Sequence, residues 1–337
     1  IFFTFPAKSV RGVMAGFQAN FQVKNLKLAN NIFYAPLAGC SDFPFRKMLT
    51  SCPVSNVRPG IFFCEMVKMD ALVRREPVTY KMLDYDSSMH PIGAQLCGAK
   101  LELAAPAARI LEDLGFDMID LNCGCPVDKV TKDGSGSALL KNPERIGDIL
   151  HAMIQAVSVP VSLKIRSGWD DDEICAAKIA TIAENVGAAM ITIHGRTRKQ
   201  AYKGKANLEH IRQAKKAVRD ILVIGCDGIL VARGSMGQPW LVEDIANFYH
   251  QNTIAKRTKE DIRLCLEKHF QEILYYKNDR KALGDFRRVA SWFLKQCSHV
   301  NELKMAIIRE KDPAKIYQAL MNFSWESVEY TPKEVNG

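Results

Sequence analysis

Short apolar runs alternate with longer amphipathic stretches over about the first 235 residues of the chain. The runs are rich in Ile, Val and Leu and show little internal alternation, as is typical of strands buried on both faces. A repeated order of strand and helix predicts βαβ units and a parallel sheet. We therefore expect eight strands, near residues 32–37, 61–66, 92–96, 118–122, 161–166, 190–194, 221–225 and 228–232.

Helical patterns fill the intervals. Between residues 101 and 115, apolar side chains recur at helical spacing, and Gly115 ends the pattern. Asn142 and Pro143 predict the start of another helix, because a capping side chain precedes a proline there. From Thr258 onward the pattern is helical throughout. The chain is therefore expected to be an α/β protein, with a (β/α)8 TIM barrel over residues 1–251 and a small all-helical C-terminal domain over residues 252–337.

The connection between the last two expected strands is unusually short. The seventh strand ends at Gly225 and the eighth begins about two residues later, whereas parallel neighbours need a crossover of roughly a dozen residues or more. We therefore expect a loop and a helix to be missing from this sequence between Gly225 and Cys226. That position is at the end of a barrel strand where active-site loops belong.

The net charge of +9 suits a polyanionic partner without requiring one. No apolar run approaches the roughly 20 residues needed to cross a bilayer, and the apolar start at residues 1–5 lacks the charged leader of a signal peptide. The ten cysteines include no C-x-x-C pair, so we expect mostly buried thiols and no metal site. Together these features predict a cytoplasmic protein, and we expect a monomer that does not bind membranes.

Polar side chains occupy nearly every expected strand end, where the catalytic groups of such barrels lie. Lys164 is the most informative of them, because it interrupts the apolar run 160–165. A buried charge there costs several kcal/mol, roughly, unless it is paired. Two interpretations remain open: a structural salt bridge, or a cation held against an anionic ligand such as a reduced flavin.

Two other strand ends carry groups suited to an anion. His194 is followed by Gly195, Arg196 and Thr197, which gathers donors after one strand. Arg233 and Gly234 follow the eighth strand, where this type of barrel commonly binds phosphate. No G-x-G-x-x-G pattern follows any strand, so a mononucleotide such as FMN fits better than a dinucleotide.

Cys125 lies in a tight loop after the fourth expected strand, between Gly124 and Pro126. Asn122, three residues earlier, offers both a donor and an acceptor. The thiol could act as a nucleophile, as a general acid beside a flavin, or could be inert and buried like Cys123. A nucleophile would need a neighbouring base, and none is adjacent in sequence.

The helical tail carries a basic run that includes Arg287, Arg288 and Lys295, all outside the apolar stripe of one expected helix. Such a run is often only a solvated face. If it contacts RNA, it would supply salt-dependent phosphate binding.

These motifs together resemble the tRNA-dihydrouridine synthases of the bacterial type, and the resemblance covers nearly the whole chain. The segments that carry it are Tyr34-Ala35-Pro36-Leu37-Ala38-Gly39, Leu121-Asn122-Cys123-Gly124-Cys125-Pro126, Gly136-Ser137-Ala138-Leu139-Leu140, Lys164-Ile165-Arg166-Ser167-Gly168-Trp169, His194-Gly195-Arg196-Thr197 and Arg233-Gly234-Ser235-Met236-Gly237-Gln238-Pro239-Trp240. The resemblance implies FMN bound to the barrel, NADPH as reductant, tRNA as partner, and reduction of uridine to 5,6-dihydrouridine.

The resemblance also implies roles by position. Cys125 would be the proton donor, and Asn122 and Arg166 would lie near the flavin and the uracil. The implied FMN contacts are Pro36, Leu37, Ala38, Gln95, Lys164, His194, Gly225, Ala232, Arg233 and Gly234. The chain departs from the family pattern in two places: only Gly225 remains of an Asn-Gly-Asp segment, and Ala232 stands where glycine is usual.

Two alternatives stay open at this point. A flavin-dependent dehydrogenase of the dihydroorotate or dihydropyrimidine type, acting on a free pyrimidine, would share the barrel, the lysine and the cysteine but would not need a basic tail. An RNA-binding protein with an inactive barrel is a second alternative, and the presence of both Cys125 and Lys164 argues against it.

Overall fold

The computed structural model describes residues 16–251 and 253–331. By internal packing these residues form two units, one of residues 16–41 and 59–230, the other of residues 42–58 and 231–331. The expectation about a signal peptide at residues 1–5 concerns a segment outside the described residues. The expected division at residue 251 into FMN-binding and RNA-binding parts stays a prediction, because packing does not show what each part binds.

Eight strands form one sheet in the order β10-β3-β4-β5-β6-β7-β8-β9, and all eight lie where the sequence places them. The neighbouring strands from β3 to β9 run parallel. Their side chains are almost all buried, which explains why the apolar runs show so little alternation. The strands are β3 Ile32–Tyr34, β4 Ile61–Lys68, β5 Ile92–Cys97, β6 Met118–Cys123, β7 Val161–Arg166, β8 Met190–His194, β9 Leu222–Ile224 and β10 Ile229–Val231.

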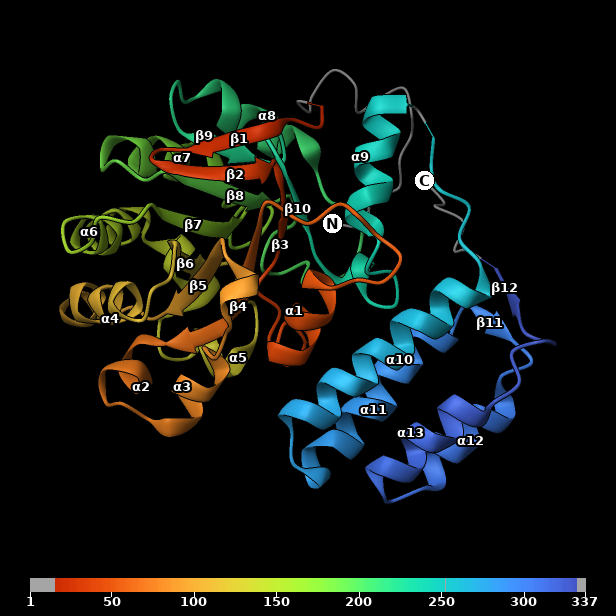
Figure 1. Cartoon of the computed structure of the whole chain (residues 1–337). Coiled ribbons are helices and arrows are strands. Elements are labelled where there is room, and N and C mark those ends of the chain that lie inside the picture. The colour runs from red at the N-terminus through yellow and green to blue at the C-terminus, as the bar shows by residue number, and fades with distance from the viewer. Residues whose placement is uncertain (1–15, 252, 332–337) are drawn as a thin grey trace. The chain divides into compact units, whose positions relative to one another are not determined.

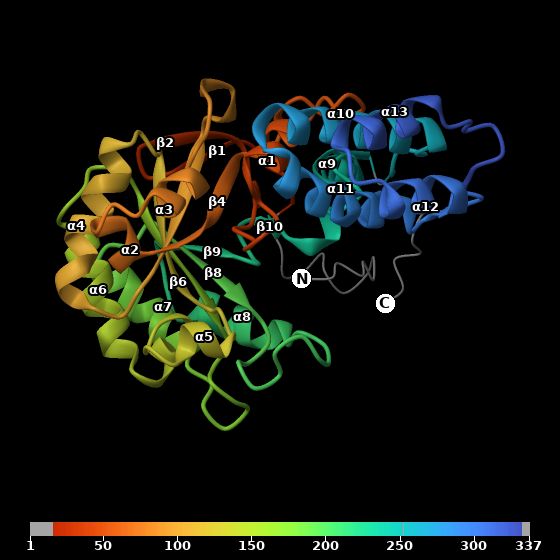
Figure 2. The same cartoon turned by 90° about the horizontal axis from the view of Figure 1, so that it is seen from below.

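Helices follow the strands of the first unit in sequence and lie on the outer side of the sheet (Figures 1 and 2). The ends expected for two of them are confirmed: α4 stops just before Gly115, which has a φ of +86°, and the side chain of Asn142 accepts from the N–H of Arg145 at the start of α6. The helices are α2 Met69–Val73, α3 Pro77–Met82, α4 Leu101–Asp113, α5 Asp128–Thr131, α6 Pro143–Ile154, α7 Ala176–Asn185 and α8 Leu208–Lys216, with short 3-10 turns η1 Ser87–Met89 and η2 Gly136–Lys141.

An antiparallel hairpin precedes the barrel and was not expected from the pattern. It pairs β1 Ala19–Val23 with β2 Leu26–Asn30. Phe21 contacts Phe33 of β3 with ring centroids 6.1 Å apart. Buried and exposed residues alternate along both strands of the hairpin. The alternating pattern typical of a strand was therefore present in the sequence, but it was short.

A tight turn joins β9 directly to β10. The N–H groups of Cys226 and Asp227 both donate to the carbonyl of Val223 at 2.9 Å, and Gly225 takes a φ of +120°. The two strands meet in a single parallel bridge, Ile224 with Gly228. No helix lies between them, so the expectation of a missing segment here stays a prediction.

The second unit is mainly helical. Within it α10, α11, α12 and α13 contact one another in a closed cycle, and α1 contacts α10. Phe270 of α10 stacks on Phe286 of α11 with ring centroids 4.1 Å apart. Two short strands also lie in the tail, where only helices were expected. The elements are α1 Phe43–Thr50, η3 Arg233–Ser235, α9 Leu241–Gln251, α10 Lys259–Tyr276, α11 Asp279–Leu294, β11 Cys297–Ser298, α12 Asn301–Arg309, α13 Pro313–Asn322 and β12 Glu329–Tyr330.

None of the helices in the described part of the chain combines the length and the apolar character needed to span a membrane.

Candidate active site

Polar side chains from three adjacent strands lie in two rows near the carboxyl ends of β5, β6 and β7. The strand register pairs Gln95 with Asp120 and Asp120 with Ser162 in one row. It pairs Asn122 with Lys164 in the next row. Because side chains two residues apart on a strand point to the same face, these five groups share one side of the sheet.

Asp120 is the one carboxylate among these five groups, and it is buried, with 3% of its surface exposed. Its Oδ2 accepts a hydrogen bond from Nε2 of Gln95 at 2.7 Å, and its Oδ1 accepts from the hydroxyl of Ser162 at 2.6 Å. Burial raises the pKa of Asp120 to about 6, while these two hydrogen bonds and the charge of Lys164 act in the opposite direction. Sequence analysis did not single out Asp120.

Lys164 supplies a cation at the same place. Burial, reinforced by the charge of Arg166, lowers its pKa to about 8, while Asp120 and Cys125 act to raise it. Among the described residues its ammonium has neither an ion-pair nor a hydrogen-bond partner, and the Asp120 carboxylate accepts from Gln95 and Ser162 instead. The structure therefore does not support the salt-bridge interpretation of this lysine.

His194 ends β8, where the strand register pairs it with Arg166 of β7. Burial, reinforced by the charges of Lys164 and Arg166, lowers its pKa to about 2. The imidazole is therefore neutral and offers one donor and one acceptor to a ligand.

The loop that carries Cys125 is held from both sides. Oδ1 of Asn122 accepts from the N–H groups of Gly124 and Cys125 at 3.1 and 2.9 Å. The carbonyl of Cys125 accepts from the N–H and the hydroxyl of Ser137 at 3.1 and 2.9 Å. Gly136, at a φ of +61°, lies so close that a Cβ there would be 2.9 Å from the Cys125 carbonyl oxygen. The backbone position of this loop is thus set by Asn122 at the end of β6 and by the segment at residues 136–137.

The two cysteines of this loop differ in environment. Cys125 is partly exposed, whereas Cys123 is fully buried in β6. Burial raises the pKa of the Cys123 thiol well above its ordinary range. Only Cys125 is therefore accessible for chemistry.

Arg166 holds loops together. Its Nε donates to the carbonyl of Gly124 at 2.9 Å, and its Nη1 donates to the carbonyls of Thr197 and Ala201, each at 2.8 Å. Its side chain is buried. Its contact with the uracil stays a prediction. In the structure the guanidinium joins the Cys125 loop to the loop after β8.

A cluster of two cations around Trp169, called the Trp169 clamp, lies in the same unit and was missed by sequence analysis. Two cations lie against the ring of Trp169: Nζ of Lys141 is 3.8 Å from its centroid and Cζ of Arg198 is 4.6 Å away. Arg198 also pairs with Asp128 at 2.7 Å. These residues come from loops far apart in sequence, so no local spacing could indicate the contact.

The remaining predicted FMN contacts of the first unit also follow strands. Pro36, Leu37 and Ala38 form a turn after β3, in which the carbonyl of Leu37 accepts from the N–H groups of the residues at positions 40 and 41. The neighbouring Gly39 donates its N–H to the carboxylate of Glu65 in β4. Gly225 follows β9 directly. The sequence thus predicted correctly that these residues follow strands, but it did not predict that Glu65 holds the turn by accepting from Gly39.

Three predicted FMN contacts belong to the second unit. Ala232 precedes the 3-10 turn η3, which contains Arg233 and Gly234. The hydroxyl of Ser235 donates to the carbonyl of Ala232 at 2.8 Å and closes this turn. A Cβ on Gly234 would make only an ordinary contact, 3.6 Å from Leu241.

The predicted RNA contacts of the tail are partly engaged in structural contacts. Nη2 of Arg287 donates to the carbonyls of Ile308 and Glu310, at 2.9 and 3.3 Å, near the end of α12. Arg288 pairs with Asp285 at 2.6 Å. Lys295 is exposed at the end of α11. The first two side chains therefore stabilise the tail whether or not they also contact RNA.

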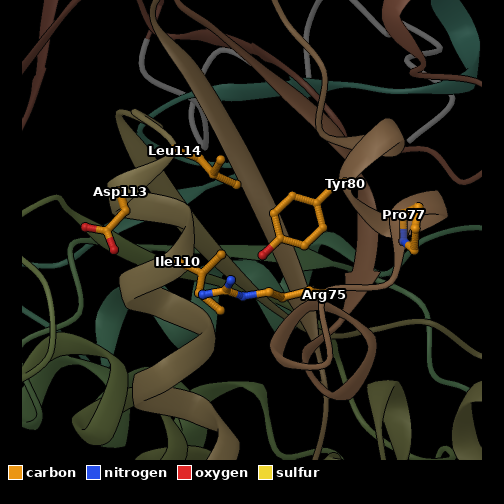
Figure 3. Close-up of a pocket in the computed structure, with 6 residues that line it drawn as sticks. All are labelled: Arg75, Pro77, Tyr80, Ile110, Asp113 and Leu114. Carbon is orange, nitrogen blue, oxygen red and sulfur yellow. The ribbon is translucent and has the colours of Figure 1, made fainter.

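A shallow cavity of about 370 Å³ lies elsewhere on the first unit, against α4. Figure 3 shows the guanidinium of Arg75 reaching toward Ile110, while the carboxylate of Asp113 points away. None of its lining residues ends a barrel strand, so it is not part of the site above. The lining consists of Arg75, Pro77, Tyr80, Ile110, Asp113 and Leu114.

A parallel barrel with an unpartnered cation, a neutral histidine and an accessible thiol at its strand ends is a scaffold suited to an enzyme acting on an anionic or polarised ligand. Solved structures with this fold include histamine dehydrogenase from Rhizobium sp. 4-9, at a TM-score of 0.51 and 12% identity over 75% of this chain and 50% of that one. Morphinone reductase matches at a TM-score of 0.50 and 12% identity over 74% of this chain and 94% of that one. At this identity the likeness establishes the TIM-barrel fold alone.

Sequence comparison gives the family. Residues 33–326 match the family described as dihydrouridine synthase. Relatives include a probable tRNA-dihydrouridine synthase of Rickettsia prowazekii, 32% identical over 90% of this chain and 97% of that protein. The tRNA-dihydrouridine synthase B of Pseudomonas syringae pv. tomato is 31% identical over 84% of this chain and 88% of its own. The chain belongs to the dihydrouridine synthase family, which makes it a flavin-dependent oxidoreductase.

Proposed function

We propose that this enzyme reduces uridine in tRNA to 5,6-dihydrouridine, with FMN as the bound flavin and NADPH as the reductant. The observation that carries the proposal is the accessible thiol of Cys125 on a loop fixed beside the unpartnered cation Lys164. Family membership and the names of the relatives support the choice of uridine in tRNA.

The residues present fit FMN. Lys164, which has no partner among the described residues, offers a cation. The neutral His194 offers a donor and an acceptor, and Gln95 offers an amide. These groups suit the polar edge of an isoalloxazine ring. Lys164 would hold the negative charge of the reduced ring. Arg233 and Gly234, after β10, would bind the phosphate. When bound, FMN would accept a hydride from NADPH and supply a hydride to the uracil ring.

The protein supplies the proton. The thiol of Cys125 gives its proton to the uracil carbon next to the one that receives the hydride, and the thiolate is then reprotonated from solvent. Asn122 keeps this thiol in place by accepting from the loop N–H groups. The hydrophobic Cys123 cannot substitute, because it is fully buried.

The helical part of the second unit, from residue 252 on, would bind the tRNA through its basic face, in the cytoplasm. Arg287, Arg288 and Lys295 are proposed to take part, with Arg280 and Lys281 at the exposed start of α11. Extruding a stacked uridine costs a few kcal/mol, roughly, and phosphate contacts would offset that cost.

Cys125→Ala tests the proposal, with Cys123→Ala as the matched control two residues away. C125A should bind FMN and accept electrons from NADPH at the normal rate, but reduce tRNA uridine ~10²–10⁴-fold more slowly, because the general acid is lost. C123A should reduce uridine within a few-fold of the wild type. Stopped-flow measurement of the two half-reactions separates these effects. Loss of uridine reduction in C123A with full activity in C125A would refute the assignment.

Free uridine and free uracil or orotate serve as competing substrates in the same assay. Reduction of a free pyrimidine in preference to tRNA would favour the dihydroorotate or dihydropyrimidine type of enzyme instead. Absence of bound flavin and of any reductase activity would favour an RNA-binding protein with an inactive barrel.

A further inference from the structure

A chain of hydrogen bonds runs through buried side chains from the Cys125 loop to Asp120. The backbone N–H groups of Gly124 and Cys125 donate to Oδ1 of Asn122. Nδ2 of Asn122 donates to Oε1 of Gln95 at 2.7 Å, and Nε2 of Gln95 donates to Oδ2 of Asp120 at 2.7 Å. Every link therefore points in the same direction, from the loop toward the carboxylate.

The two ends of this chain fix the direction. A backbone N–H can only donate, and an ionised carboxylate can only accept. Asn122 and Gln95, between them, could each be turned by 180° in a different setting. Here each amide has only one orientation in which every contact pairs a donor with an acceptor. A buried amide turned the other way would oppose two donors or two acceptors, which is costly in a buried position.

We propose that Asp120 is a positioning residue for the reaction: by accepting from Gln95, it fixes the orientation of Gln95 and Asn122 and thereby the position of the Cys125 loop. The inference rests on the proposed role of Cys125 as proton donor. Among the described residues no hydrogen bond joins Asp120 to the thiol or to the loop directly, so it acts on the loop through the two amides. Without Asp120, Gln95 no longer has a neighbour that can only accept a hydrogen bond. Its amide can then turn by 180°, and the amide of Asn122 can in turn rotate away from the loop.

The surroundings of Asp120 keep it an acceptor. The hydroxyl of Ser162 donates to the other carboxylate oxygen, and the charge of Lys164 favours the ionised form. Ser162 lies on the side away from Gln95, so removing its hydroxyl leaves every link to the loop intact. It is also fully buried, like its partner. Ser162→Ala is therefore the matched control.

The first experiment measures the loop without using activity. The full-length chain is treated with iodoacetamide at pH 8, and mass spectrometry follows the rate at which the Cys125 peptide is alkylated. In Asp120→Leu, which keeps the approximate shape of the side chain but cannot accept, the rate should change several-fold. Asp120→Asn can still present an oxygen to Gln95 and a donor to Ser162, so it should restore the wild-type rate. S162A should match the wild type.

Equal alkylation rates in the wild type, D120L and S162A would overturn the proposal, as would equal changes in D120L and S162A. If D120L does not fold, Gln95→Met breaks the same chain at the neighbouring link. Q95M should then show the altered alkylation rate, and a folded Q95M with the wild-type rate would also overturn the proposal.

The second experiment measures the two half-reactions with FMN-loaded enzyme. D120L should reduce tRNA uridine roughly 10²-fold more slowly, as expected when a reacting group is displaced by about 1 Å. The electron transfer from NADPH should slow much less, because there D120L loses only the support that Asp120 gives to the charge of Lys164. D120N should recover most of that loss. An equal loss in both half-reactions would overturn the proposal, because it would indicate general damage to the barrel. A wild-type enzyme that reduces no uridine would refute the proposed function, while the alkylation rates would still show whether Asp120 controls the loop.

Discussion

His269 allows a sharp test of the electrostatics of the helical unit. Its side chain is 2% exposed and lies among the rings of Phe45, Trp292 and Phe293. Burial, reinforced by the charge of Arg288, lowers its pKa to about 3. The folded protein therefore keeps this imidazole neutral down to about pH 3, whereas the unfolded chain binds a proton below about pH 6.5.

The sign and size of the effect follow from that difference. Between about pH 6.5 and pH 3 the unfolded state binds more protons at this site than the folded state, so the free energy of unfolding falls as the pH is lowered. Between pH 7.5 and pH 5 the loss from this one group is about 2 kcal/mol. Replacing the histidine with an apolar ring removes this loss, because nothing is left to titrate.

The assay compares urea unfolding of the wild type and His269→Phe at pH 7.5 and pH 5. Tryptophan fluorescence suits the purpose, since three of the four tryptophans, at positions 240, 292 and 325, lie in the second unit. The wild type should lose about 2 kcal/mol more than H269F on acidification. Other titrating groups are present in both proteins and cancel in this comparison. His250→Gln, at an exposed position of α9, should keep the wild-type dependence. Equal losses in the wild type and H269F would refute the reasoning.

Two further predictions concern ligands. Lys164→Met should bind FMN at least ~10-fold more weakly or slow its reduction, because the anionic ring loses its cation; flavin titration and stopped-flow absorbance check this, and a folded K164M with normal values of both contradicts it. Arg280→Ser with Lys281→Ser should weaken tRNA binding and lower its salt slope by roughly one for each lost phosphate contact, while FMN content stays normal. Arg287→Ala and Arg288→Ala are a poorer test, because their guanidinium groups also hold the tail together. An unchanged affinity across a salt series in the R280S/K281S variant would remove this face from the binding site.

The barrel could be predicted because its strands are buried on both faces and its helices carry their own start and stop residues. The hairpin at residues 19–30 was missed because its alternating pattern is only five residues long on each side. Packing of α1 with the tail helices could not be predicted either, since it depends on contacts between segments more than 200 residues apart, such as Phe43 with Tyr276.

The candidate site was predicted unevenly. Lys164 was found because it interrupts an apolar run, and Asp120 interrupts the run 118–122 in the same way. The same criterion applied to both strands would have found the carboxylate as well. The clamp around Trp169 and the engagement of Arg287 and Arg288 had no such signal. They depend on which loops meet in space, and a single sequence does not encode that in its spacing.

The direct turn from β9 to β10 leaves the barrel with one weakly paired junction between neighbouring strands, at residues 224–228, which we call the seam. Each pair of neighbouring strands from β3 to β9 has at least two paired residues, but here a single bridge between Ile224 and Gly228 joins the two edges. Backbone amides along such an edge have fewer partners than those inside the sheet, so this is where the closed sheet opens most readily to solvent. Residues inserted between β9 and β10 would lengthen a loop without changing the register of any other strand pair. The seam is thus the place in the barrel where extra chain, including the loop and helix expected after Gly225, can be accommodated with the least rearrangement.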